Sequence, residues 1–454
     1  MKVNRRAFVT TGVSAAITAA AAKGERPAGP NDRIRVGFIG VGGMGRFNLV
    51  DFQLMPEVDV VAVCDVWAHN RNLAVEMTNG QADPYNDFRE VLDRQDIDVA
   101  VISTPDHWHA PIMIAACEAG KDVYIEKPLS HTLRAGRKMV EAARRHHRVV
   151  QMGTQQRSGA HYQEAVNLIR DGKLGKVTRV HCWNFENQTP AGIGDFPPDE
   201  VPQGLDWDLY LGPAPRVPFQ ANRFINAFRW FWDYSGGKIT DWGTHHLDIV
   251  QWAMNVKGPR TAFAVGQKLV VEDDRETPDT MEVVFEYPGF ICTYSHRDGN
   301  AHPPYDSSYG IEFLGTHATL FINREGFRVL PETRGYSAVD EPVYLREVRA
   351  SQDPLPPWQD VKRKERRSRA QYQVGEGSVQ HVAHVRNFID CVRSREKPAS
   401  DIETGHYSTS APHLANIALK LGRKIEWDWK KERIIGDAEA NRLLTKQYRS
   451  PWKV

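Results

Sequence analysis

The stretch KITDWGTHHLD, residues 238–248, concentrates side chains that can transfer protons. Asp241, His245 and Asp248 are spaced i, i+4 and i+7, which predicts one shared face of a helix. His245 suits a general base, because the unperturbed pKa of histidine lies near neutral pH. Asp241 could orient that base or bind a substrate hydroxyl. We interpret His246, which faces away from His245, as a packed or hydrogen-bonded histidine.

The same residues could instead hold a metal ion. Asp241 and His245 would supply two ligands, and a third could come from D-H-W-H at 106–109. The helix patterns H-x-x-x-H and H-E-x-x-H are absent from the sequence, so we predict no metal site. His107 stays open between packing and function.

A second segment has the pattern of a dinucleotide-binding loop. Residues 34–39 read IRVGFI, typical of a buried parallel strand, and G-V-G-G-M-G follows at 40–45. Gly40 permits a tight turn, Gly42 lets a pyrophosphate approach the backbone, and Gly45 lets the next helix pack closely on the strand. The N–H groups at the start of that helix would face the phosphates.

Asp65 ends the next apolar run, residues 58–66. An acidic side chain there can accept hydrogen bonds from both ribose hydroxyls of NAD and repels the 2′-phosphate of NADP. Strand, glycines, helix, strand and acid in this order predict NAD binding. A glycine-rich turn in a fold without a nucleotide is the alternative.

Helical and apolar patterns then alternate, which predicts a parallel sheet with right-handed connections. Helices are expected at 83–96, 110–121 and 133–148, and strands at 97–104, 122–128 and 149–154. Ligands bind at the carboxyl ends of such strands. Two polar clusters, T-P-D-H-W-H at 104–109 and E-K-P at 126–128, lie at these ends.

Lys127 follows an apolar strand and is flanked by Glu126 and Pro128. We interpret it as a functional lysine rather than a surface one. Its ammonium group can hydrogen-bond a substrate oxygen and stabilise alkoxide character while hydride leaves the carbon for a nicotinamide.

After about residue 160 the pattern becomes that of an antiparallel sheet. Helix 160–175 and strand 176–185 precede two hairpins, whose turns are Pro288-Gly289 and Thr316-His317. Two further amphipathic helices are expected at 381–397 and 410–425.

Residues 183–234 are rich in aromatic side chains, including Trp207 and Trp230. Aromatic rings can stack on the apolar faces of sugars, and packing of a loop or a subunit contact is the alternative.

The first 30 residues have a basic start with Arg5 and Arg6 and a short alanine-rich run, which predicts a twin-arginine signal peptide and export to the periplasm. A disordered basic tail is the alternative. The run is too short for a stable membrane span. The net charge of +1 gives no general attraction to nucleic acid, and the basic run at 361–371 is interpreted as a solvated loop.

Four motifs in this order resemble the glucose–fructose oxidoreductase/inositol dehydrogenase (Gfo/Idh/MocA) family: G-V-G-G-M-G at 40–45 with Asp65, T-P-D-H-W-H at 104–109, E-K-P at 126–128 and D-W-G-T-H-H-L-D at 241–248. The resemblance implies an α/β Rossmann domain, placed at 31–155, and an α+β domain with an open, mostly antiparallel sheet, placed at 156–454. It also implies NAD or, less favoured here, NADP, a carbohydrate substrate, and a homo-oligomer.

The resemblance further implies roles for single residues. Gly40, Gly42, Gly45 and Asp65 match the pyrophosphate loop and the ribose anchor, and Thr104 and His109 match positions that line the cofactor. Glu126 and Lys127 match the pair at the nicotinamide ribose and the reacting centre, Gln155 an amide near the nicotinamide, and Arg229, in a loose alignment, a cofactor-contacting arginine. Asp241 and His245 match the catalytic D-x-x-x-H.

We therefore predict an exported NAD-dependent oxidoreductase acting on a hydroxyl-bearing carbon of a sugar, polyol or glycoside. One alternative is an NAD-dependent glycosidase that retains its cofactor and runs oxidation, elimination and reduction without net redox change. A catalytically silent nucleotide-binding protein is the other.

Overall fold

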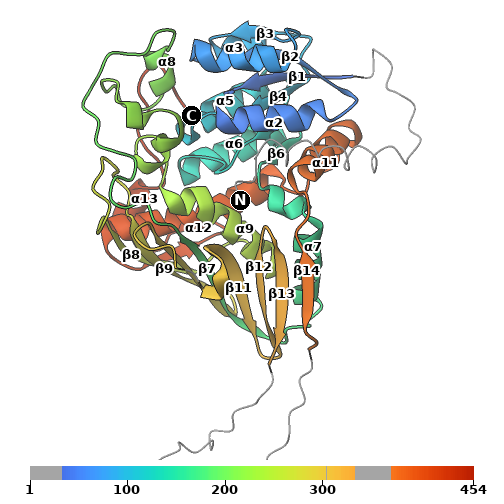
Figure 1. Cartoon of the computed structure of the whole chain (residues 1–454), viewed down its shortest axis with the longest axis vertical. Coiled ribbons are helices and arrows are strands. Elements are labelled where there is room, and N and C mark those ends of the chain that lie inside the picture. Colours follow the sequence, from blue (N-terminus) through green and yellow to red (C-terminus); the bar gives the residue numbers. More distant parts are fainter. Residues whose placement is uncertain (1–32, 303, 333–369) are drawn as a thin grey trace, which may run out of the picture.

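The computed structural model describes residues 33–302, 304–332 and 370–454. In these ranges the first six strands form a parallel sheet in the order β3-β2-β1-β4-β5-β6, so the expected Rossmann sheet is confirmed (Figure 1). The strands are β1 (Ile34–Ile39), β2 (Val58–Cys64), β3 (Asp83–Tyr85), β4 (Val99–Ile102), β5 (Asp122–Ile125) and β6 (Val150–Met152). The predicted signal peptide and most of the basic run at 361–371 lie outside the described residues.

Helices connect these strands, but the helix expected at 110–121 already begins at Asp106, and the start expected for the helix at 83–96 is wrong. The helices are α2 (Gly43–Gln53), α3 (Ala68–Met77), α4 (Phe88–Asp93), α5 (Asp106–Glu118) and α6 (Leu133–Arg145). Instead of a helix over 83–96, Asp83–Tyr85 pairs with β2 as an edge strand, where Pro84 needs no N–H for a ladder. Asp87 is the N-cap residue of α4, because its side chain accepts a hydrogen bond from the Arg89 backbone amide. Helix α4 therefore begins only at Phe88.

The second sheet has ten strands within the described residues, in the order β14-β13-β12-β11-β7-β10-β9-β8-β15-β16. They are β7 (Val177–Phe185), β8 (Thr261–Gln267), β9 (Thr280–Tyr287), β10 (Phe290–Arg297), β11 (Tyr309–Gly315), β12 (Ala318–Asn323), β13 (Gly326–Pro331), β14 (Gln373–Glu376), β15 (Ile425–Asp428) and β16 (Arg433–Ile434). Only the pairing of β7 with β10 is parallel among these, so the mostly antiparallel sheet and both hairpins are confirmed.

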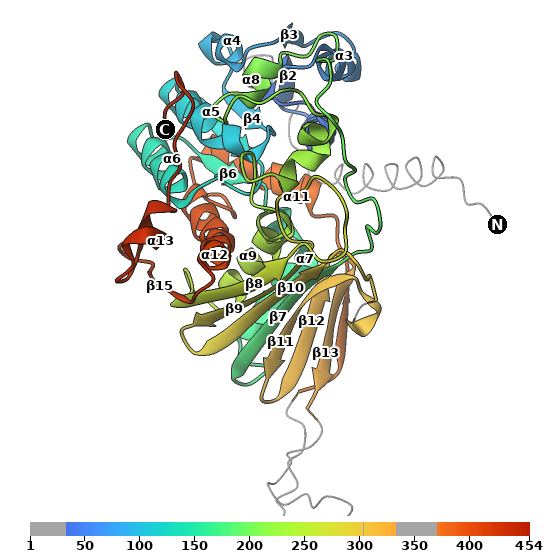
Figure 2. The same cartoon turned by 90° about the vertical axis from the view of Figure 1, so that its left-hand side faces the viewer.

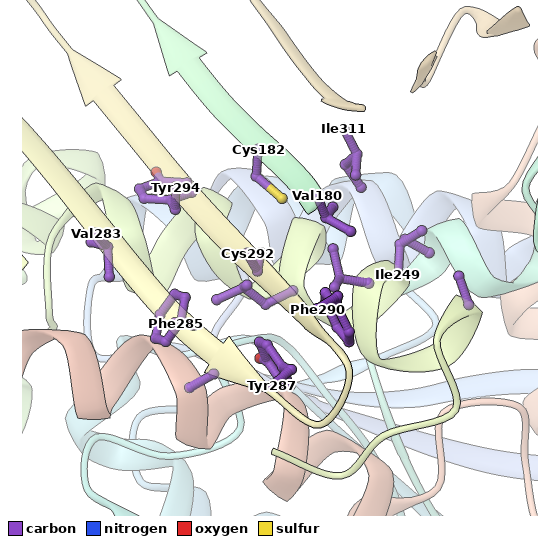
Figure 3. Close-up of a cluster of buried hydrophobic side chains, with 14 of the residues drawn as sticks. Val180, Cys182, Ile249, Val283, Phe285, Tyr287, Phe290, Cys292, Tyr294 and Ile311 are labelled. Carbon is purple, nitrogen blue, oxygen red and sulfur yellow. The ribbon is translucent and has the colours of Figure 1, made fainter. Parts of the chain in front are cut away.

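Helices α7 (Ala160–Arg170), α9 (Thr244–Ala253) and α12 (Ile402–Leu421) lie between this sheet and the Rossmann domain (Figures 1 and 2). Figure 3 shows the core that they share with β7, β9 and β10. Tyr287 and Phe290 stack there with ring centroids 4.9 Å apart, and Phe285 is fully buried beside them. Each such side chain contributes roughly 1.5–3 kcal/mol by its burial.

Helix α11 (His381–Ser394) returns from the second sheet to the Rossmann domain, where it lies beside α2 (Figure 1). The Phe388 ring is 5.7 Å from that of Tyr124 and 6.2 Å from that of Phe52. This helix, which the predicted boundary after residue 155 assigns to the second domain, therefore packs into the core of the first. The boundary itself stays a prediction.

The remaining elements are short. They are η2 (Gln155–Ser158), α8 (Trp207–Leu211), η3 (Ala221–Arg223), η4 (Ile225–Trp230), the π-helical turn η5 (Ile239–Gly243), η6 (Pro304–Asp306) and α13 (Ala438–Arg442). In the part of the chain that the structure describes, every helix is too short or too polar to cross a bilayer.

Residues 183–234, which we call the cover, reach the carboxyl end of β2, where α8 lies (Figure 2). Their contact with the Rossmann domain includes backbone hydrogen bonds from Asp206 N to Val66 O and from Ala68 N to Gly204 O, of 2.9 and 2.8 Å. The cover thus meets the chain directly after Asp65.

Candidate active site

A cavity of about 330 Å³ lies where the glycine loop, the ends of the Rossmann strands, the cover and α9 meet. Most predicted site residues line it: Gly40, Gly42, Asp65, Thr104, Glu126, Lys127, Gln155, Arg229, Asp241 and His245. Gly45 and His109 do not. The fold therefore brings residues from across more than 200 positions of sequence to one cavity.

The glycine loop is shaped for close approach of a ligand. Gly40 has φ +83°, and a Cβ on it would lie 2.8 Å from the backbone of Ser103. A Cβ on Gly45 would lie 2.0 Å from the Gly40 carbonyl oxygen, so this glycine permits tight packing of α2 without lining the cavity. Gly43 has no atom near its Cβ position, which leaves the start of α2 open. These features fit a dinucleotide pyrophosphate.

Asp65 is held at the rim of this loop. Its two carboxylate oxygens accept hydrogen bonds from the backbone amides of Val41 and Trp67, both of 2.9 Å. Burial raises the pKa of Asp65, and these hydrogen bonds oppose the rise. Asn70 Nδ2 also donates to Oδ2, at 3.4 Å, so of the about four acceptor sites of a carboxylate one remains for a ribose hydroxyl.

Lys127, Asp241 and Arg229 form a charged cluster on the cavity wall. Lys127 Nζ donates to Asp241 Oδ1 and to the Asp241 backbone oxygen, and Arg229 Nε donates to the same Oδ1 at 3.1 Å. Burial alone would raise the pKa of Asp241, but the charges of Lys127 and Arg229 hold it well below its usual value. Two cations therefore share one carboxylate, which leaves a positive charge available to a developing alkoxide.

The π-helical turn η5 carries Asp241, and α9 begins directly after it with His245 near its start. A π-helical turn holds one residue more than an α-helical turn, so the residues after it are rotated away from the face expected for a regular α-helix. Asp241 and His245 line the cavity, whereas Asp248 points elsewhere and binds Arg157, with Nε–Oδ2 and Nη2–Oδ1 distances of 2.7 and 2.8 Å. The expectation of one face for Asp241, His245 and Asp248 is thus wrong for Asp248.

The pKa of His245 is not near neutral, contrary to the expectation from its residue type. The side chain is only 5% exposed, and burial lowers its pKa well below the usual value, aided by the charges of Lys127 and Arg324. Its Nδ1 is buried without a hydrogen-bond partner. His245 is therefore a neutral imidazole that can accept a hydrogen bond and briefly take a proton, with Asp241 nearby to oppose the two cations.

Glu126 and Gln155 are joined on the wall behind Lys127. Gln155 Nε2 donates to Glu126 Oε1 at 3.1 Å and to the Tyr124 hydroxyl at 3.2 Å, and Asn48 Nδ2 donates to Glu126 Oε1 at 3.0 Å. Burial raises the pKa of Glu126. Glu126 is thus fixed by amides on two sides.

His109 does not reach the cavity, because its two ring nitrogens contact backbone oxygens, Nδ1 that of Pro128 at 2.8 Å and Nε2 that of Thr104 at 2.9 Å. It ties the end of β4 to the E-K-P segment. Thr104 does line the cavity, and its hydroxyl is buried without a hydrogen-bond partner. That hydroxyl is available to a bound nucleotide.

Two further histidines belong to the packing. His246 is buried and stacks on Trp242 with centroids 6.2 Å apart, and burial lowers its pKa to about 3. His107 Nε2 contacts the Tyr210 backbone oxygen at 3.1 Å. Within the described ranges, no group of three or more His, Cys, Asp or Glu side chains could hold a metal ion.

Sequence reasoning missed several lining residues. Asp106, which opens α5, accepts a hydrogen bond from Ser235, and burial raises its pKa to about 7. Arg324 and His381 line the cavity from the end of β12 and the start of α11. Nothing near Arg324 or His381 in the sequence indicates chemistry, because only the tertiary fold brings them to the site.

Comparison with family models decides the family. Residues 34–154 match the model described as "Oxidoreductase family, NAD-binding Rossmann fold", and residues 141–281 with 377–454, and 214–412, match two models of its "C-terminal alpha/beta domain". The chain belongs to the Gfo/Idh/MocA oxidoreductase family. Its first domain is an NAD-binding Rossmann domain.

Relatives of this Gfo/Idh/MocA protein differ in activity. It is 31% identical over 204 residues to "Glycosyl hydrolase family 109 protein" of Shewanella pealeana, covering 39% of this chain and 45% of that protein. It is 30% identical over 168 residues to "Inositol 2-dehydrogenase" of Salmonella typhimurium, covering 35% and 50%. The alignments thus span half or less of these curated relatives.

Solved structures share the fold over nearly their whole length. The levoglucosan dehydrogenase complex with NADH and L-sorbose aligns with a TM-score of 0.63 and 16% identity, over 87% of this chain and 99% of that one. The WlbA dehydrogenase from Bordetella pertussis, in complex with NADH and UDP-GlcNAcA, gives 0.61 and 19%, also over 87% and 99%. At such identity the likeness concerns the fold.

Proposed function

We propose that the protein oxidises or reduces a hydroxyl-bearing carbon of a sugar, polyol or glycoside with NAD as the hydride carrier. The observation that carries the proposal is the Lys127–Asp241–Arg229 cluster with His245 on the wall of the cavity that the glycine loop also lines. A nucleotide-binding protein without activity would have no need of a proton acceptor and a shared positive charge at that place.

Lys127, Asp241 and His245 each have a defined task in alcohol oxidation. Bound NAD would supply a nicotinamide that accepts hydride from the carbinol carbon. His245 accepts the hydroxyl proton, and Lys127 donates a hydrogen bond to the same oxygen and stabilises its negative charge. Asp241 holds the Lys127 ammonium group in place, because its carboxylate and backbone oxygens both accept from Nζ.

The preference for NAD over NADP is assigned to Asp65. Its carboxylate lies at the end of β2 beside the glycine loop, where it offers an acceptor to a ribose hydroxyl and a like charge to a 2′-phosphate. Asp65→Ala should weaken NAD binding and relax the discrimination against NADP. Titration of the unaltered protein that gives tighter binding of NADP than of NAD would remove this assignment.

The experiment that tests the reaction is a substrate panel with added NAD. Sugars, polyols and glycosides are supplied, and formation of reduced cofactor is followed by absorbance. A substrate-dependent rise supports the proposal. Bound cofactor with no turnover of any kind on the panel would favour the silent alternative.

The glycosidase cycle is a second candidate, favoured by the 31% identity to the glycosyl hydrolase family 109 protein. The same residues would abstract protons in both reactions, so geometry does not separate them. Aryl glycosides separate them, since cleavage with no net reduced cofactor indicates the glycosidase and reduced cofactor without cleavage indicates the dehydrogenase.

A further inference from the structure

Arg324 introduces a positive charge into the cavity that the reaction described above does not use. It follows β12 directly and lines the same cavity as His245. Its guanidinium lies 4.8 Å from the centre of the Trp242 ring, which is itself a lining residue. The cation–π contact with Trp242 uses the face of the guanidinium group, so its N–H edge stays available for hydrogen bonding.

That edge has no partner of its own. Arg324 Nε is buried without a hydrogen-bond partner, and no described carboxylate forms an ion pair with it. The two imidazoles on the same wall also have unpaired nitrogens, Nδ1 of His245 and Nδ1 of His381. Buried donors are normally paired, so three unpaired polar atoms on one stretch of wall indicate a place for a polar ligand.

The charges of the cavity show which ligand fits. Lys127 and Arg229 already share the carboxylate of Asp241, whereas Arg324 forms no ion pair with a described carboxylate. Burial and the charge of Arg324 lower the pKa of His381 to about 4, so His381 adds a hydrogen-bonding group and no charge. One guanidinium with a neutral imidazole balances one negative charge.

We propose that Arg324, with Trp242 and His381, forms a subsite for the carboxylate of the substrate, which makes the substrate a sugar acid. A planar carboxylate matches the guanidinium edge in two parallel hydrogen bonds. A phosphate monoester carries close to two charges at neutral pH, whereas Arg324 itself supplies one. The inference rests on the proposed function in one respect, which is that the bound sugar acid is also the molecule that reacts.

The test uses matched acids and neutral sugars on the protein loaded with NAD. Binding of glucuronate against glucose, galacturonate against galactose, and gluconate against glucitol is measured by titration calorimetry, with glucose 6-phosphate as a further ligand. At least one acid should bind roughly 10–100-fold more tightly than its neutral partner. Arg324→Gln should abolish that ratio, and Arg324→Lys should restore part of it.

Arg328→Gln is the matched control, because it removes the same charge from the same hairpin without touching the cavity lining. It should keep the preference for acids, and retained NAD binding shows that each variant is folded. The subsite is wrong if no pair favours the acid, if the preference survives Arg324→Gln, or if only the phosphate binds tightly.

Failure of this subsite and failure of the proposed reaction are separate results. An acid that binds through Arg324 but is never oxidised upholds the subsite and refutes the reaction. Turnover of neutral sugars with no preference for acids upholds the reaction and refutes the subsite.

Discussion

At the scale of single residues, the proton and charge chemistry depends on Lys127 and His245. Lys127→Met or His245→Ala should lower turnover by a factor on the order of 10² or more while NAD still binds, because neither side chain belongs to the glycine loop. Lys138→Met, at an exposed position of α6, and His146→Ala, at the partly exposed residue that ends it, provide matched controls that should keep the unaltered rate. Near-normal rates in both site variants would refute the assigned roles.

Asp106 predicts a pH dependence of stability in the nucleotide-free protein. Burial raises its pKa to about 7, so the folded state binds more protons than the unfolded state from about pH 4 to 7. The free energy of unfolding therefore falls as pH rises through that window. Asp106→Asn removes this loss. The urea midpoint of Asp106→Asn minus that of the unaltered protein should therefore be larger at pH 8 than at pH 4.5. The exposed Asp93→Asn should show no such trend, and an equal absence in Asp106→Asn would contradict the argument.

Residue types and flanks predicted part of the cavity lining but not its full chemistry. The spacing of the glycines and the positions of Asp65 and Lys127 at the ends of apolar strands can be recognised locally in the sequence. Arg324 and His381 carry none, since they reach the site only through pairing of distant strands and docking of α11. The low pKa of His245 also depends on burial and on the charge of Arg324, and neither can be predicted from residues 238–248 alone.

At the scale of elements, we expect the cover to limit release of the nucleotide. Phe224 lines the cavity, is buried, and packs on Trp67 with ring centroids 5.3 Å apart. Phe224→Ala should speed release of NAD on the order of tenfold, because it weakens the closure beside Asp65. Phe196→Ala, in the same segment but 43% exposed and outside the lining, is the control. Equal release rates measured by stopped-flow dilution for both variants would show that the cover does not limit release.

One element that the sequence misplaced buries polar groups that are satisfied inside the fold. Helix α12 begins at Ile402 rather than near residue 410, and its first turns bury polar side chains such as Ser408, which donates to Asp248 at 2.5 Å. Apolar periodicity cannot show such a turn. The π-helical turn at Ile239–Gly243 is equally invisible, because it differs from an α-helix by one residue.

At the scale of the whole molecule, the two sheets are joined through helices rather than by a linker alone. Helix α11 packs into the Rossmann core, and α12 lies against both α6 and the second sheet. The cavity is lined by both domains and by the cover. A nucleotide enclosed in this way would leave slowly.

The last prediction follows from that enclosure and from the N-terminal residues. Residues 1–30 predict twin-arginine export, a route that carries folded proteins, and we propose that the protein takes up NAD(H) before export and keeps it. A retained cofactor must be recycled in place, which suits a second substrate, an external electron acceptor or the redox-neutral glycosidase cycle. The protein is purified without added nucleotide and denatured, and the supernatant is assayed. We expect near-stoichiometric NAD(H), with less in Phe224→Ala than in Phe196→Ala. An empty protein that binds NAD weakly and reversibly would refute retention.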